Sequence, residues 1–81
     1  MDIKRHVIIS ELFDKPISIA KENNLSIEDF KTIVRQATVG LHKQGLTMVM
    51  VSDASREFKH TSEDTPLAVI AMKTISEFFR A

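Results

Sequence analysis

The sequence lacks cysteine altogether, and it has only two glycines and two prolines among its 81 residues. Without cysteine, neither a disulfide nor a thiolate metal site can reinforce the fold, and this composition suits a reducing cytoplasm. A chain of this length makes one domain, which we take as residues 1–81, and it buries only a modest fraction of its surface. Five phenylalanines, four methionines and many aliphatic residues can still supply one small hydrophobic core.

Long apolar runs and an excess of one charge are also missing. No stretch of about 18 consecutive apolar residues occurs, so we expect no membrane-spanning helix and no membrane partner. The apolar residues that precede Glu11 are too few for a signal peptide. Eleven basic residues balance eleven acidic ones. Because nucleic-acid-binding proteins usually carry a basic excess, this balance argues against that class.

No catalytic, metal-binding or phosphate-binding motif is present. No serine has the Gly-x-Ser-x-Gly setting of a nucleophile elbow, and neither glycine belongs to a phosphate-cradling loop. The histidines His6, His42 and His60 fall on separate segments, so we expect them at the surface and predict no metal site. The adjacent acids Glu28 and Asp29 stand at a predicted helix start, where negative charge is favourable. We therefore predict that the protein is not an enzyme and has no cofactor.

A short helix, a tight turn and a long helix are predicted over residues 17–45. Asn23 and Asn24 can adopt the left-handed conformation that ends a helix. Ser26 can then cap the long helix, with Asp29 in the capping-box position. The long helix has one apolar face, whose members are Ile27, Phe30, Ile33, Val34, Ala37 and Leu41.

Two further helices are predicted at the ends of the chain. Residues 2–14 have an apolar side, and Asp14-Lys15-Pro16 should end this helix because the residue before proline avoids helical geometry. The β-branched run at residues 7–9 leaves a strand as the alternative there. Near the C-terminus, Thr65 resembles an N-cap before a proline, which predicts a helix over residues 66–80.

Between the long helix and the last one, the sequence predicts two β-strands. Residues 45–51 are rich in β-branched side chains after a glycine, and residues 52–55 are polar and turn-like. Residues 56–60 can return as the second strand, with Phe58 facing inward. Because the tip has no glycine, we expect a loop longer than a two-residue hairpin turn.

This order of elements resembles the winged helix-turn-helix superfamily over roughly residues 3–60. The spacing of Ala20, Leu25, Phe30 and Ile33 resembles the helix-turn-helix pattern, with Asn24 where that family prefers glycine. Three runs are also similar to the first winged helix of the bacterial segregation and condensation protein B, namely residues 12–17, 45–49 and 56–61. That resemblance implies protein contact within a chromosome-organising complex, whereas the winged helices of transcription regulators imply duplex DNA binding.

We therefore predict an α+β fold, a small winged helix-turn-helix with three helices, a β-hairpin wing and a C-terminal helix. The predicted function is duplex DNA binding by a transcriptional regulator in the cytoplasm. The alternative is a protein-interaction module in a chromosome segregation or replication assembly. The first turns of a recognition helix enter the major groove, and the candidate DNA contacts are Lys21, Lys31, Thr32, Arg35 and Gln36 from the helix-turn-helix and Arg56 and Lys59 from the wing. Among these, Arg35 suits guanine and Gln36 suits adenine.

The last helix has more apolar surface than one core contact needs. A second apolar stripe on it consists of Val69, Met72, Ile75 and Phe79. We expect this stripe to pack against the same helix of a second copy, giving a homodimer with two recognition helices for a palindromic site. The alternative is that the helix lies deep in the core of its own chain, with Phe79 exposed near the end.

Overall fold

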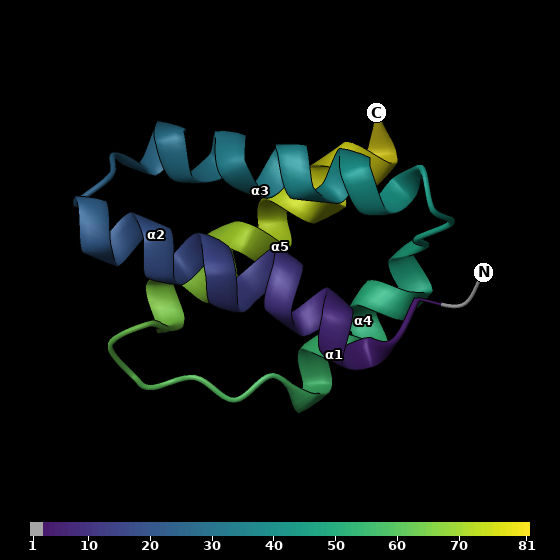
Figure 1. The fold of residues 1–81 in the computed structure, drawn as a ribbon, viewed down its shortest axis with the longest axis horizontal. Coiled ribbons are helices and arrows are strands. Elements are labelled where there is room, and N and C mark those ends of the chain that lie inside the picture. Colours follow the sequence, from purple (N-terminus) through teal and green to yellow (C-terminus); the bar gives the residue numbers. More distant parts are fainter. Residues whose placement is uncertain (1–2) are drawn as a thin grey trace.

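Helices form the whole regular structure of the computed structural model, which describes residues 3–81 (Figure 1). They are α1 (Arg5–Ile9), the π-helical turn η1 (Ser10–Asp14), α2 (Lys15–Asn23), α3 (Ile27–His42), α4 (Met48–Glu57) and α5 (Thr65–Arg80). No strand occurs within these described residues, so the predicted α+β winged helix-turn-helix fold is wrong. The first helix was predicted to begin at residue 2, which lies outside the described residues.

The helix break predicted at Asp14-Lys15-Pro16 is also wrong, because α1, η1 and α2 follow one another without interruption. Lys15 keeps helical angles (φ −65°, ψ −49°), and its N–H donates to the Ser10 carbonyl five residues earlier. In a regular α-helix the Pro16 ring would clash with the carbonyl four residues earlier, that of Leu12. The wider π turn gives the ring room. The same turn lets the consecutive residues Leu12 and Phe13 both face the core, where both are buried.

The turn between α2 and α3 confirms the predicted capping. Asn24 is left-handed, with φ 49° and ψ 50°, and the N–H of Leu25 donates to the Ala20 carbonyl at 3.0 Å. Ser26 then caps α3 by accepting a hydrogen bond from the Asp29 N–H at 3.2 Å. The two helices run side by side in opposite directions (Figure 1), so they form an αα-hairpin.

Gly45 ends the long helix as predicted. Its φ is +103°, a left-handed conformation that favours glycine. The N–H of Leu46 donates to the Leu41 carbonyl at 3.0 Å, which completes the same type of helix ending as in the first turn. Leu46 is buried, so this ending also fixes the direction in which the chain enters α4.

The two strands predicted over residues 45–51 and 56–60 are wrong, because α4 occupies most of this segment. Thr47 is its N-cap, and the hydroxyl accepts a hydrogen bond from the Met50 N–H at 3.3 Å. A capped helix start competes directly with an extended strand here, since the cap satisfies an amide that would otherwise be left unpaired at the helix start.

The apolar residues of α4 also follow the helical period rather than an alternation. Val51 and Ala54 are fully buried and stand three residues apart. Phe58, directly after the helix, lies on the same side and is half-buried. Val49 is exposed, although a strand would have placed it on the same face as Val51. The β-branched content that favoured a strand was therefore overridden by packing of one helical face.

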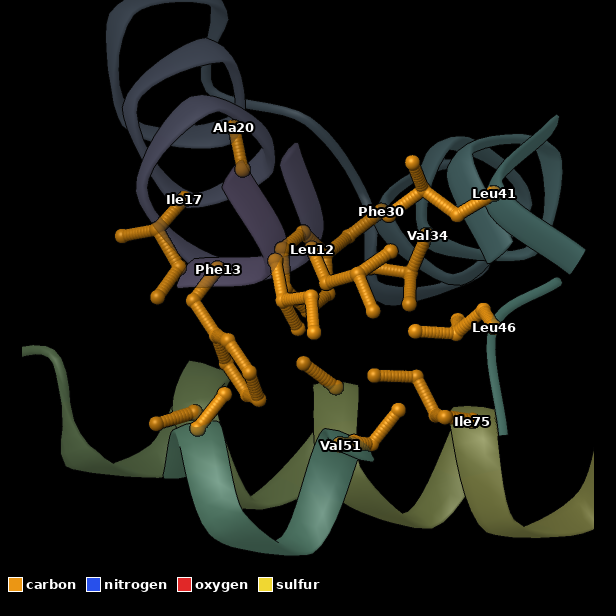
Figure 2. Close-up of a cluster of buried hydrophobic side chains, with 14 residues drawn as sticks. Leu12, Phe13, Ile17, Ala20, Phe30, Val34, Leu41, Leu46, Val51 and Ile75 are labelled. Atoms are coloured by element: carbon orange, nitrogen blue, oxygen red, sulfur yellow. The ribbon is translucent and has the colours of Figure 1, made fainter. Parts of the chain in front are cut away.

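The last helix begins at Thr65, one residue before the predicted start, and Asp64 rather than Thr65 occupies the N-cap position. The hydrophobic core lies between the helical hairpin and the pair formed by α4 and α5 (Figure 2). Its residues are Ile8, Leu12, Phe13, Ile17, Ala20, Phe30, Val34, Leu41, Leu46, Val51, Ala54, Ala68, Ala71 and Ile75. Two buried threonines, Thr38 and Thr74, donate their hydroxyl hydrogens to carbonyls of their own helices at 2.8 Å. Because these hydroxyl groups are hydrogen-bonded, their burial costs little folding free energy.

We expect Phe30→Ala to lower the free energy of unfolding by about 3–5 kcal/mol, because a fully buried aromatic ring would leave a large cavity. Chemical denaturation monitored by circular dichroism measures this change. An unchanged midpoint would contradict the placement of this side chain in the core.

We expect Thr47→Ala to cost about 1 kcal/mol, because it removes the side-chain cap of α4. A matched control is Thr32→Ala, since Thr32 is exposed within α3 and caps no helix. The control should change the free energy of unfolding by less than about 0.5 kcal/mol. Equal effects of the two substitutions would argue against a helix that starts at residue 48.

Candidate functional site

Three residues predicted to contact DNA, namely Thr32, Arg35 and Gln36, lie exposed on α3. The Thr32 hydroxyl donates to the Glu28 carbonyl at 3.0 Å. The Nζ of Lys31 lies 3.6 Å from the Glu28 carboxylate. The first turns of α3 therefore present a face of mixed charge, on which an acid partly neutralises one of the predicted cations.

The other predicted DNA contacts lie elsewhere, and two of them form ion pairs. Lys21 Nζ lies 2.9 Å from the buried Oδ1 of Asp64, a contact that joins the end of α2 to the start of α5. The hydrogen bond to Asp64, together with its charge, raises the pKa of Lys21. Arg56 pairs with Asp53 at 3.3 Å within α4, and Lys59 is exposed in the loop that follows. This loop lies on the opposite side of the molecule from α3 (Figure 1), so the seven residues share no single surface.

The predicted dimer stripe is divided between the core and the surface. Ile75 is fully buried in the core of its own chain, so it has no surface to offer a second copy. Phe79 is half-buried, and its ring centroid lies 5.7 Å from that of His42 and 5.2 Å from that of Phe78. Val69 is 48% exposed and Met72 is half-buried, and these two residues both line a groove.

This groove, of about 320 Å³, lies between the end of α4 and the first half of α5. Its buried floor is formed by Phe13 and Ala68, and its apolar walls by Phe58, Val69 and Met72. The Phe58 ring stacks on the Phe13 ring with centroids 4.9 Å apart. Because the core residue Phe13 holds Phe58 in place, the apolar wall is fixed by the fold rather than by a flexible side chain.

Three polar residues complete the lining, namely Ser55, His60 and Lys73. The His60 ring lies 5.2 Å from the Phe58 ring, and its Nδ1 is 3.1 Å from the Thr65 hydroxyl. These contacts hold the loop after α4 against the start of α5. Within residues 3–81, no aspartate or glutamate lines the groove.

A second, larger cavity of about 580 Å³ lies between the C-terminal halves of α3 and α5. Arg35 lines it together with His42, Glu77 and the two phenylalanines at the end of α5. The His42 ring meets the Phe78 ring edge to face, with centroids 5.4 Å apart. In this cavity a predicted DNA contact, Arg35, shares the lining with an aromatic cluster.

The described residues contain no cluster of three or more histidine, aspartate or glutamate side chains suited to holding a metal ion. No helix in this part of the chain has the length and hydrophobicity to cross a membrane. Comparison with protein-family models, with curated proteins and with solved structures gives no match. The prediction from sequence missed the groove because it placed Phe58 in a strand. The three-residue and four-residue spacing of Val51, Ala54 and Phe58 was the signal that could have located it.

Proposed function

We propose that the protein is a small helical interaction module that binds a helical segment of another polypeptide in the groove between α4 and α5. The observation that carries this proposal is the exposed apolar wall of the groove, where Val69 stands beside Phe58 and Met72 above a buried apolar floor. A single exposed apolar residue needs no explanation, but apolar side chains from two elements around one concave surface are typical of a binding site.

The size of the groove favours a few inserted side chains. A volume of about 320 Å³ is at the lower end of the roughly 300–1,000 Å³ found for ligand pockets. An amphipathic helix places apolar side chains on one face at spacings of three and four residues, and it binds such grooves with that face. Its contacts would cover Val69, which is the most exposed large apolar side chain of α5.

The charges support a protein partner over a nucleic acid. The whole chain has no net charge, and three of the five cations predicted to contact DNA are in ion pairs, namely Lys21, Lys31 and Arg56. DNA affinity depends mainly on cations that neutralise phosphates. Paired cations must first lose their carboxylate partners, which lowers the gain from each phosphate contact.

We expect Val69→Glu to weaken binding of helical peptides about tenfold or more, because it places a charge on the apolar wall. A displayed library of random peptides, selected against the wild-type chain, provides the ligands, and fluorescence anisotropy measures their affinity. Val49→Glu is the matched control, since Val49 is 72% exposed on α4 and lies outside the groove.

This control variant should bind the selected peptides like the wild type. Equal loss in both variants would argue against the groove as the binding site. Selection of peptides without apolar residues at helical spacing would argue against the proposed class of partner.

Duplex DNA binding is the second candidate, and one observation favours it. Thr32, Arg35 and Gln36 are exposed on neighbouring turns of α3, and Arg35 forms no ion pair within the described residues. The described residues contain no β-hairpin wing, so α3 would have to supply the base contacts alone. A protein that binds duplex DNA in this way would act as a transcriptional regulator, as expected from the sequence.

If α3 binds DNA, Arg35→Ala should cost about 1–3 kcal/mol of binding free energy through loss of a bidentate base contact. Arg80→Ala is the control, since Arg80 is an exposed cation on α5. Anisotropy of a labelled mixed-sequence duplex at two salt concentrations measures both variants, and affinity should fall as salt rises. No binding at low salt with micromolar protein would exclude this candidate.

A further inference from the structure

The groove between α4 and α5 also has a charge preference. We infer that its partner is an acidic amphipathic helix, whose apolar side chains insert between Phe58 and Met72 and whose carboxylates lie against Lys73. This inference rests on the proposed function, because it specifies the chemistry of the segment that the groove binds.

The first observation is that the cations of this region adjoin its apolar wall. Lys73 follows Val69 by four residues on α5, so the two side chains are neighbours on one helical face. Lys73 belongs to none of the ion pairs of the described residues. Lys59 stands in the chain between Phe58 and His60, which both line the groove. Lys59 itself is not part of the lining, so a ligand in the groove meets one ammonium group, that of Lys73, beside the apolar contacts.

The second observation is that two acids at the ends of the loop after α4 are already compensated. Glu57 directly precedes Phe58, but its carboxylate accepts a hydrogen bond from Arg5 of α1 at 2.7 Å. At the other end of the loop, Asp64 pairs with Lys21, and the charge of Glu63 also acts to raise the pKa of Lys21. These carboxylates serve contacts with α1 and α2 and do not line the groove.

Two further acids lie close to groove residues in the sequence, namely Asp14, which directly follows Phe13, and Glu77, one turn after Lys73 on α5; neither lines the groove. Glu77 lines the next depression along the helix, together with Met72, Lys73, Ser76 and Arg80, so Lys73 borders both hollows. The groove itself is therefore lined by cationic and neutral groups, although the chain as a whole is electrically neutral. Charge complementarity at such a surface favours a partner with carboxylates beside its apolar residues.

Charge also argues against two other occupants. A second copy of this chain, docked groove to groove about a twofold axis, would bring Lys73 toward the Lys73 of the second copy. A nucleic-acid backbone would match the cations but would leave the apolar walls of Phe58, Val69 and Met72 without contacts. An acidic amphipathic helix satisfies both features of the groove.

Two synthetic peptides of about 18 residues, long enough for several helical turns, test the inference. They share leucines at positions i, i+3, i+4 and i+7 and differ only in flanking residues, which are glutamate in one and lysine in the other. We expect the glutamate peptide to bind at least tenfold more tightly at low salt, and we expect this difference to narrow as salt rises. Fluorescence anisotropy with the full chain measures both affinities.

Lys73→Glu should reverse the preference, and Lys73→Gln should reduce it. Lys43→Glu is the matched control, because Lys43 is an exposed cation after α3 and lies outside the groove. It should keep the preference for glutamate. Circular dichroism confirms that each variant remains helical before binding is measured.

The outcomes separate the inference from the proposed function. Failure of both peptides to bind would overturn the proposed function and the inference with it. Equal affinity for the two peptides, or no change in Lys73→Glu, would overturn the acidic partner and leave the groove as a binding site. Sedimentation equilibrium that shows a dimer lost in Val69→Glu would identify a second copy as the occupant instead.

Discussion

The structure depends on the way in which one proline is accommodated in the first helix. Pro16 lies where a regular α-helix would be kinked or broken, and the π turn of η1 lets the helix continue to Asn23. The uninterrupted helix packs α1 against α4 and α2 against α3, and η1 contacts both α3 and α5. Leu12 and Phe13 are the buried residues at this meeting point. Because Phe13 also forms the floor of the groove, the core and the candidate site share a side chain. A substitution of Phe13 would therefore change stability and binding together.

The same small core explains which surface remains open on α5. This helix is apolar on most sides, and its own chain covers two of them, with α3 along one side and η1 beneath. Ala68, Ala71 and Ile75 are buried by these contacts, in agreement with the alternative that placed the helix in its own core. Val69 remains exposed beyond the reach of α4, whose end contributes Phe58 to the opposite wall. The exposed apolar residue beside the groove is thus a consequence of a helix that is apolar on most sides and is covered mainly by α3 and η1.

Local chemistry could be predicted from the sequence, and long-range compensation could not. Asn24 and Ser26 were placed correctly, and the start of α5 to within one residue, because helix endings are determined by a few adjacent residues. Pro16 misled the prediction because the π turn that relieves it is favoured by the burial of Leu12 and Phe13 against other helices. The segment after Gly45 has both strand-forming side chains and a good N-cap, and only tertiary packing decides between them. The helical spacing of Val51, Ala54 and Phe58 could have indicated one wall of the groove, but the opposite wall depends on how α5 packs and could not be predicted.

The distribution of charge after folding says more about partners than the composition does. Folding joins five of the eleven basic residues to carboxylates, and in four of these pairs at least one side chain is more than half exposed. Exposed pairs of this kind contribute about 0–1 kcal/mol each, so they have little effect on stability. Their larger effect is to remove individual charges from the surface field. The pairs of Arg5 with Glu57 and Lys21 with Asp64 compensate two acids near the groove, whereas Lys73 keeps its charge beside it. A neutral composition is therefore compatible with a local basic surface, and the charge balance that argued against DNA binding does not argue against an acidic protein partner.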